Sequence, residues 1–401
     1  MAKNTHMTHL EDAVFLLGIE GTRQSVNFLI GMRETLNGTT NRPTTTSVKW
    51  DGAPAIFIGQ HPETKEFIVA KKSLFNKDPL FYRSIAEINA TKDLNPELKS
   101  KFKAAFEGYK NANIRGIIQG DFLWENKDLK IEIIDGEEVI TFHPNTIVYS
   151  VPKNSDLGKK IAASKFGIVW HTTYTGRTLQ TMNASFGVRM PAQPRQGVQF
   201  DAMYKDVAGS ASLTRSESRT LARHLTLAGR HFKKIQRSSF AVFDNEALAI
   251  LATSYTNSYI RANRVPSERE LATGFLPYLD AYAAKQINAL KSDAGKKKKR
   301  QAMSQLISPV RRMGSEQIGH MFSLYHHLQI SKNMLVKKLN SSGFIKTFLK
   351  TQDGWKVTGQ EGFVAIDKSG ANAVKLVDRL DFSYANFSPD VIKGWQTDLR
   401  R

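Results

Sequence analysis

The sequence predicts an α+β fold in which a core of antiparallel sheets is interrupted by a large, basic, all-helical insertion. Short apolar runs separated by Gly, Pro, Asn and Asp fill most of residues 45–176, as in strands joined by turns. From Thr214 to about residue 340 the apolar residues recur at helical spacing, and strand-like runs return after residue 343. We therefore expect the late strands to complete the sheet that begins before residue 176.

Three segments follow from this pattern. Residues 1–176 form the first part of the core and open with a helix that stops at Asn37-Gly38, a helix-ending pair. Residues 177–342 form the helical insertion, and its first stretch, 177–213, contains Pro, Gly and Ser and is expected to be a connecting segment. Residues 343–401 form the second part of the core.

Two capping boxes mark helix starts inside the insertion. Thr214 and Glu217 have the Ser/Thr-x-x-Glu spacing, in which each side chain satisfies a free backbone N–H of the first turn. Ser267 and Glu270 repeat it. The basic run Gly295–Arg300 is expected to be a turn between two helices. The spacing predicts helices at about 214–237, 244–262, 267–292, 299–312 and 315–340.

Positive charge is concentrated in the insertion. The chain of 401 residues has 57 Lys and Arg against 37 Asp and Glu, a net charge of +20. Residues 177–350 hold 28 basic and 10 acidic side chains, a net +18. Such a localised excess is typical of a surface that binds a polyanion, most often nucleic acid. A solvated basic surface or binding to anionic lipid is the alternative.

Composition excludes several classes of protein. The chain has no cysteine, which excludes disulfides, thiolate zinc sites and cysteine nucleophiles. No apolar stretch approaches the ~20 residues of a membrane-spanning helix, and the first residues do not form a secretory signal. A phosphate-binding GxxxxGK[ST] loop and a G-x-S-x-G motif are also missing from the sequence. We expect a cytoplasmic protein with no membrane partner, and nothing in the sequence indicates an obligate oligomer.

A possible nucleophile stands in the run Lys49-Trp50-Asp51-Gly52, between two short strands. A lysine can act as a nucleophile where its surroundings favour the free amine. The Asp lies two residues further along and shares its face of the strand, and the Gly permits close approach of the backbone to a ligand. The alternative is an ordinary turn at a strand end.

Three further charged positions lie at strand ends. Gln119-Gly120-Asp121 ends an apolar strand, Glu361 precedes the strand Gly362-Phe-Val, and Lys375 lies on the next strand. A glutamate in such a place can hold a divalent metal over phosphate oxygens, and a lysine can neutralise a phosphate. For each the alternative is an exposed strand charge or, for Asp121, a loop residue.

Taken in order, these runs resemble the motifs of the covalent nucleotidyltransferase superfamily, which comprises ATP-dependent DNA ligases, RNA ligases and mRNA capping enzymes. The resemblance spans residues 45–176 and 343–380. It implies a ligase adenylation-type, ATP-grasp-like core, with Lys49 attacking the α-phosphate of ATP to form lysyl–AMP. Glu361 and Asp121 would hold the metal, and Lys375 would contact the α-phosphate.

The same resemblance assigns the remaining nucleotide contacts. Asp51 and Gly52 would shape the ribose and phosphate side of the pocket, and Lys72 would be a basic contact. Tyr149 would be the aromatic residue that stacks on adenine. Arg379 would compensate for the second lysine that the family carries two residues after the position of Lys375.

We therefore expect an ATP-dependent, Mg²⁺-requiring polynucleotide ligase that joins 5′-phosphate and 3′-hydroxyl ends. RNA and nicked DNA are both open as substrates. One alternative is a non-catalytic nucleic-acid-binding protein on a degenerate nucleotidyltransferase scaffold, and another is AMP transfer to a non-nucleic acceptor. The residues expected to bind nucleic acid are Lys296, Lys297, Lys298, Lys299, Arg300, Arg311 and Arg312.

Histidines are frequent in the insertion. His320, His326 and His327 fall on one predicted helix, where either a metal site or an ordinary helix surface is possible. We favour the helix surface because no acidic residue follows at helical spacing. His224 and His231 are expected to join the polyanion-binding surface.

Overall fold

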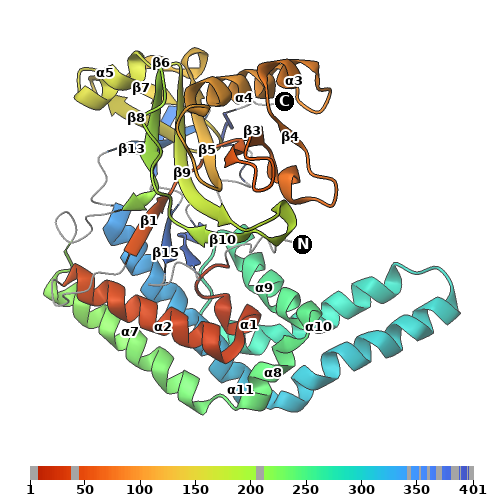
Figure 1. The fold of residues 1–401 in the computed structure, drawn as a ribbon. Helices are drawn as coiled ribbons and strands as arrows, with labels where there is room; N and C mark the ends of the chain where they lie inside the picture. The colour runs from red at the N-terminus through yellow and green to blue at the C-terminus, as the bar shows by residue number, and fades with distance from the viewer. Residues whose placement is uncertain are drawn as a thin grey trace.

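The chain forms a mixed α+β structure with a sheet-rich half above a helical half (Figure 1). The computed structural model describes residues 8–37, 45–204, 212–340, 345–351, 354–358, 362–366, 373–380, 388, 390–394 and 396. Within these residues the strands form three sheets that are antiparallel except where β11 (Gly197–Asp201) pairs with β9 (Phe166–Thr175). None of the described helices combines the length and the apolar content that crossing a bilayer requires.

The upper half, here called the β lobe, contains two of the sheets. The seven-stranded sheet contains, besides β9 and β11, the strands β10 (Asn183–Phe186), β5 (Ile117–Glu125), β2 (Ala55–Gln60), β3 (Phe67–Ala70) and β4 (Phe81–Tyr82). The five-stranded sheet has the order β14 (Gly354–Thr358), β13 (Lys346–Thr351), β8 (Val148–Pro152), β7 (Glu137–Phe142) and β6 (Lys130–Ile134). The helices of the lobe are α3 (Ile85–Ala90), α4 (Pro96–Tyr109) and α5 (Asp156–Ala162).

One face of the seven-stranded sheet packs against α4. The side chain of Asn95 accepts a hydrogen bond from the backbone N–H of Leu98, and Pro96 occupies the first position of the helix, where its missing N–H costs nothing. Phe102 and Tyr109 of α4 are buried with Trp170 of β9 in one apolar cluster. Asp121 of β5 belongs to the opposite face of the sheet, where its neighbours Leu123 and Val169 are buried in a second apolar cluster.

The lower half, here called the helical layer, has its own apolar core around Phe15, Phe275, Phe322 and Tyr325. Its helices are α1 (Ala13–Leu16), α2 (Gly18–Leu36), α7 (Arg215–Lys234), α8 (Arg237–Ala241), α9 (Glu246–Arg261), α10 (Glu268–Asn288) and α11 (Asp293–Asn340). Both predicted capping boxes are confirmed, at the starts of α7 and α10. The helix α11 is broken at Gly314, where φ is 82°, a conformation that glycine adopts without strain.

Between the two halves lies a four-stranded sheet, here called the central sheet (Figure 1). Its order is β12 (Met203–Tyr204), β1 (Thr45–Lys49), β15 (Gly362–Ile366) and β16 (Ala373–Leu376). Strand β15 pairs with β1, and β13 pairs with β8 of the five-stranded sheet. The strands after residue 343 thus complete sheets begun before residue 176, as the sequence predicted.

Two boundaries differ from the sequence-based prediction. The first helix was assigned to the sheet core, but Leu29, Met32 and Leu36 of α2 belong to the apolar core of the helical layer. Apolar spacing shows that a helix has a buried face but does not identify what covers it. Residues 177–213 were expected to connect two segments, but β10 and β11 lie there and extend β9, while β12 extends β1.

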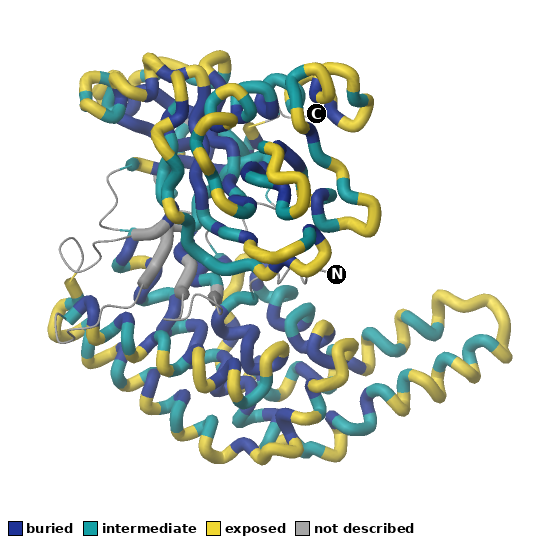
Figure 2. Tube along the Cα trace, in the orientation of Figure 1, coloured by how far each residue is buried: buried dark blue, intermediate teal, exposed yellow. Residues whose placement is uncertain are grey.

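The second half of α10 and the first part of α11 form a helical hairpin that projects from the body (Figure 1). We call residues 280–306 the helical arm. None of these residues is buried, and the projecting hairpin in Figure 2 is coloured exposed and intermediate. The run Lys296–Arg300 was predicted to be a turn but is helical, in the first turns of α11. Ser292 caps this end, because its Oγ accepts a hydrogen bond from the N–H of Gly295.

Candidate active site

The central sheet places Lys49 and Lys375 on one face. Lys49 ends β1 and pairs with Gly362 of β15, and Lys375 of β16 pairs with Val364. Directly paired residues share a face of a sheet, as do alternate residues of one strand. Val364 pairs with Lys375 on one side and with Ser47 on the other, and Ser47 is two residues before Lys49 on β1. The register therefore puts the two lysines on the same face of the sheet.

The other face of the central sheet is closed by the helical layer. Phe363 and Leu376, which pair with each other, are 3% and 0% exposed and belong to the apolar core of the helical layer. Val377 follows β16 and belongs instead to the apolar core of the β lobe, with Trp124 and Tyr149. The lysine-bearing face is thus directed toward the β lobe, and Lys49 itself is half-buried.

Gly362, beside Lys49, has no room for a side chain. A Cβ added there would lie 2.5 Å from the carbonyl oxygen of Leu376 and 2.8 Å from Val377 Cγ2. Glycine at this position lets β15 and β16 approach closely next to the lysine. Glu361, the predicted metal ligand immediately before it, lies outside the described residues.

The loop after Lys49 is held by the side chain of Asp51. This carboxylate is buried and accepts hydrogen bonds from Asn145 Nδ2 at 2.6 Å and from the backbone N–H groups of Thr146 at 2.6 Å and Ile147 at 2.8 Å. Burial raises the pKa of Asp51, while the three hydrogen bonds and the charge of Lys49 act against that rise. Asp51, predicted to line the nucleotide pocket, thus anchors the loop to the segment that directly precedes β8.

Tyr149 was predicted to stack on adenine, but the structure places it in the interior. Its ring is 0% exposed and lies against Phe142, with the ring centroids 5.2 Å apart and the planes at 15°, and against Trp50 at 5.0 Å. Its hydroxyl accepts a hydrogen bond of 2.7 Å from the backbone N–H of Asp51. The stacking role is therefore corrected to a supporting one, in which Tyr149 fixes the loop that follows Lys49.

Gly52 brings this loop against β5. A Cβ added at Gly52 would lie 2.6 Å from Asp121 Cβ and 2.9 Å from the carbonyl oxygen of Phe122. Two backbone hydrogen bonds tie the same segments, from the N–H of Ala53 to Phe122 O at 2.9 Å and from the N–H of Phe122 to Pro54 O at 3.1 Å. The sequence runs K-x-D-G and Q-G-D, which are far apart along the chain, are thus in direct contact.

Asp121 has a neighbour that the motif did not predict. His171 Nε2 of β9 lies 3.5 Å from Asp121 Oδ2, and their side chains are 24% and 21% exposed. A partly exposed carboxylate next to an imidazole can bind a hard cation or accept a proton. No spacing in the sequence joins these two residues, because the contact depends on the pairing of β5 with β9.

The resemblance also assigned Lys72 and Arg379 to the nucleotide. Lys72 is exposed in a short 3₁₀ helix, Lys72–Phe75. Arg379 is only 3% exposed, and its Nη1 lies 3.1 Å from Asp12 and 3.5 Å from Glu11, between the central sheet and the helical layer. Since these carboxylates already satisfy the guanidinium, Arg379 is corrected from a nucleotide contact to a structural ion-pair partner.

The predicted nucleic-acid-binding residues lie on the helical arm and at its base. Lys296–Arg300 are exposed or half-buried in the first turns of α11. Arg311 and Arg312 are exposed, and Arg311 pairs with Asp280 of α10 at 2.5 Å. The arm holds seven basic residues, Lys285, Lys291, Lys296, Lys297, Lys298, Lys299 and Arg300, against Asp280 and Asp293.

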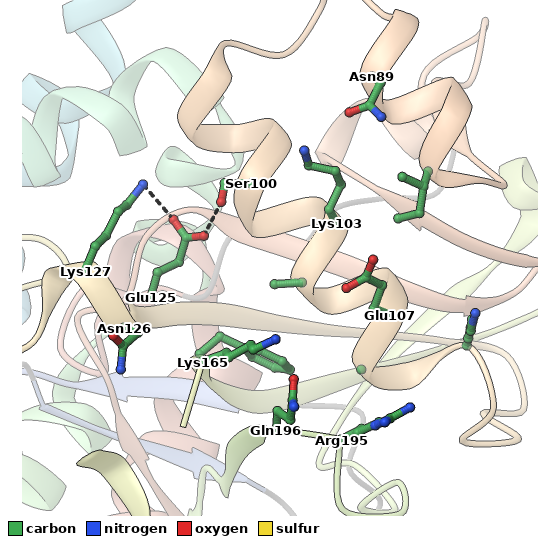
Figure 3. A pocket seen from close by; sticks show the side chains of 15 residues that line it. Asn89, Ser100, Lys103, Glu107, Glu125, Asn126, Lys127, Lys165, Arg195 and Gln196 are labelled. Carbon is green, nitrogen blue, oxygen red and sulfur yellow. Dashed lines mark hydrogen bonds and ion pairs between the residues drawn. The ribbon is translucent and has the colours of Figure 1, made fainter. Parts of the chain in front are cut away.

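A hollow of about 1000 Å³ lies beside α4 in the β lobe (Figure 3). Glu125 lies at one end, held by Lys127 at 3.0 Å and Ser100 at 2.5 Å. None of the residues predicted for the active site lines it. The basic side chains around it are Lys103, Lys110, Lys127, Lys165 and Arg195.

One protein-family model matches residues 4–390, and it is described as a family of unknown function, DUF6267. The chain belongs to this family. No curated protein and no solved structure matches the chain. The matched residues include the β lobe, the central sheet and the helical layer.

Proposed function

We propose that this protein is an ATP-dependent polynucleotide ligase that forms a lysyl–AMP intermediate on Lys49. The observation that carries the proposal is the convergence of three separate segments. Lys49 and Lys375 share one face of the central sheet, and the loop that follows Lys49 is in contact with Asp121. A nucleophile, a second cation and a carboxylate are the groups that nucleotidyl transfer requires.

In the first step the neutral amine of Lys49 attacks the α-phosphate of ATP. A nitrogen–phosphorus bond forms, the bond from that phosphorus to the bridging oxygen breaks, pyrophosphate leaves and the amine gives up a proton. Lys375 supplies positive charge for the phosphate oxygens in the transition state. Lys49 is half-buried on the face of the central sheet that is directed toward the β lobe. This position suits attack on a nucleotide bound between the central sheet and the β lobe.

In the following steps the adenylate moves from Lys49 to a 5′-phosphate end, and the nitrogen–phosphorus bond breaks as a new phosphorus–oxygen bond forms. A 3′-hydroxyl then attacks the activated 5′-phosphate and AMP leaves. RNA ends and nicked DNA both fit this chemistry.

A divalent cation would offset the charge of the transferred phosphate. Asp121 is suited to hold Mg²⁺ because its carboxylate is partly exposed and shares its surroundings with one imidazole and no described cation at ion-pair distance. Glu361 would be the second carboxylate in this proposal.

A second candidate function is nucleic-acid binding on a related scaffold without catalysis. It is favoured by the internal roles of Tyr149 and Arg379, which remove two of the nucleotide contacts that the sequence motifs suggested. Both candidates use the basic helical arm to bind nucleic acid.

The test is self-adenylylation of the full chain with α-labelled ATP and Mg²⁺. The wild-type protein should become labelled through a bond that is stable to alkali and broken by acid, as a lysine phosphoramidate is. Lys49→Ala and Lys49→Arg should not be labelled, because neither supplies a free amine. Lys356→Ala removes an exposed lysine of β14 and should be labelled like the wild type.

Label on either Lys49 variant would remove Lys49 as the nucleophile. An unlabelled wild type that still binds RNA or DNA would favour the non-catalytic candidate. Sealing assays on single-stranded RNA and on nicked duplex DNA separate the two substrate classes.

A further inference from the structure

Five histidines and a glutamate converge where α7, α10 and α11 meet. His224 and His231 lie on α7, His320, His326 and His327 lie on α11, and Glu268 begins α10. The three histidines of α11 were expected on a solvated helix surface. Instead His327 is 3% exposed and the other four are half-buried.

The histidines pair across two helices. His224 and His231 are seven residues apart on α7, and His320 and His327 are seven apart on α11, so each pair lies two turns apart on one side of its helix. His224 Nδ1 is 3.1 Å from His327 Nδ1, and His231 Nδ1 is 3.1 Å from His320 Nδ1. This order, with the first residue of one helix facing the last of the other, shows that α7 and α11 run antiparallel here.

In His327 and His231, the contact between the helices uses one ring nitrogen, and the second ring nitrogen remains for another ligand. In His327, Nε2 points to Glu268 Oε1 at 3.4 Å. In His231, Nδ1 is occupied by His320, and its Nε2 makes no hydrogen bond with the part of the chain that the structure describes. One ligand atom each from His231, Glu268 and His327 can be chosen so that all three lie within 4.8 Å of one another.

We propose that His231, Glu268 and His327 bind a Zn²⁺ ion that joins α7, α10 and α11. Two imidazole nitrogens and a carboxylate oxygen are ligands that zinc prefers, with a water completing a tetrahedron. Ligand atoms of a tetrahedral zinc ion lie roughly 3.3 Å apart, given bonds of about 2.0–2.1 Å. The 3.4 Å between His327 and Glu268 already matches, and the partly exposed side chains of Glu268 and His231 can turn to close the remaining distance.

The two remaining histidines of the pairs have the positions of supporting residues. A histidine that binds zinc through one nitrogen usually donates its other N–H to a neighbour, which fixes its orientation. His224 would accept such a bond from His327, and His320 would accept one from His231. Burial lowers the pKa of both proposed ligand histidines, that of His327 to about 4, so their rings are neutral at neutral pH.

The proposed zinc site lies in a basic part of the chain, so positive side chains near it oppose the binding of a cation. Burial lowers the pKa of His224 and of His231; the charge of Arg223 adds to this for His224 and that of Lys234 for His231, while Glu268 opposes both shifts. His326 Nδ1 and His320 Nε2 are buried and make no hydrogen bond with the described residues. Buried polar atoms without partners are uncommon, and the carboxylate nearest to His320 Nε2 among the ion pairs of the described residues is Glu316 Oε1, at 3.7 Å.

The experiment measures zinc in the untagged full chain, since a polyhistidine tag would bind zinc itself. Protein stripped with a chelator and titrated with Zn²⁺ alone should bind one ion per chain, and Co²⁺ in its place should give the visible absorption of tetrahedral coordination. Glu268→Gln and His231→Asn should each raise the dissociation constant at least 100-fold. His320→Gln, which removes only a supporting contact, should raise it about 10- to 100-fold.

His61→Asn is the matched control, because His61 lies in the β lobe, where its Nδ1 accepts hydrogen bonds from a turn. It should bind zinc like the wild type. Zinc should also raise the melting temperature of the wild type but not that of Glu268→Gln. Because the side chain of Glu268 is partly exposed, this variant should fold normally, and a loss of zinc binding would then reflect the lost ligand. A wild type that binds no stoichiometric zinc, or ligand variants that bind it as tightly as the wild type, would overturn the proposal.

Discussion

Lys332 Nζ lies 2.7 Å from Glu11 Oε1, and both side chains are 0% exposed. Lys332 comes from α11 and Glu11 from the segment before α1, so this ion pair ties the start of the described chain to the helical layer. Arg379, after β16, also lies 3.5 Å from Glu11. Although burial alone would raise it, the charges of Lys332 and Arg379 lower the pKa of Glu11 to about 2.

Removing one partner of this pair should be costly. Lys332→Met should lower the free energy of unfolding by about 3–5 kcal/mol, because it leaves Glu11 charged and less well paired in the interior. Adding Glu11→Gln should recover part of the loss, since the uncompensated charge is then removed. Lys337→Met, at an exposed position of the same helix, should stay within about 0.5 kcal/mol of the wild type. Denaturant unfolding checks all three, and additive losses in the double variant would contradict the coupling.

A methyl group at Gly52 should disturb the loop after Lys49. Gly52→Ala places a Cβ 2.6 Å from that of Asp121, and relief of this overlap should cost about 1–3 kcal/mol of stability and displace Lys49. Gly229 of α7 has open space around its Cβ position, so Gly229→Ala should stabilise the protein by about 0.5–1 kcal/mol. Thermal unfolding measures both, and equal effects of the two changes would be inconsistent with the close contact.

The stability should depend on pH through His143. Burial lowers the pKa of this imidazole from 6.5 to about 4. As the pH falls from about 6.5 to about 4, the unfolded chain takes up a proton that the folded chain does not, so the free energy of unfolding decreases. His143→Gln lacks this contribution and keeps a donor for Thr146 O. Relative to this variant, the wild type should lose roughly 1–3 kcal/mol between pH 7 and pH 4, and parallel curves would refute the assignment.

The charge of Lys375 should matter for adenylylation of Lys49. If Lys375 stabilises the transferred phosphate, Lys375→Ala should slow self-adenylylation by about 10²-fold, the scale of losing one electrostatic stabiliser. Asp121→Glu, which keeps the carboxylate, should be much more active than Asp121→Ala. Lys346→Ala removes a lysine whose side chain is 58% exposed and should not change the rate. Single-turnover labelling measures each, and normal labelling of Lys375→Ala would exclude this role.

Neutralising the helical arm should weaken nucleic-acid binding without affecting Lys49. Changing Lys296–Arg300 to Gln should reduce the salt dependence of binding, by about 0.9 per lost phosphate contact on duplex or 0.7 on single strands. Self-adenylylation should be unchanged because it needs no nucleic acid. The matched control neutralises five exposed lysines of the β lobe, Lys65, Lys77, Lys92, Lys159 and Lys160. If both quintuple variants lost affinity equally, the arm would have no special part in binding.

Local signals in the sequence located the elements well. The capping boxes at Thr214 and Ser267 predicted helix starts because both partners lie within one turn. The strands between residues 177 and 213 escaped prediction because their polar and glycine-rich runs become strands only by hydrogen bonding to β9 and β1. The sequence also could not show which surface covers the buried face of α2, because helices from a distant part of the chain supply that surface.

For the candidate site, the sequence supplied residue types but not their surroundings. It singled out Lys49, Asp121 and Lys375, whose shared neighbourhood depends on strand register. Tyr149 and Arg379 were given ligand roles because their burial is not visible in a motif. For the histidine cluster a signal did exist, since equal seven-residue spacings on two helices point to matched faces.

The central sheet also imposes an order on folding. Its strands come from four places in the chain, and β1 pairs with β12 over only two residues and otherwise with β15, more than 300 residues later. Contacts between such distant segments form slowly. On a ribosome, the strand that carries Lys49 would wait with one edge unpaired until residues 362–366 emerge, and an open edge invites aggregation. A chain terminated between β14 and β15 would therefore keep the strands of the β lobe but leave β1 without its β15 partner, and it would depend on chaperones.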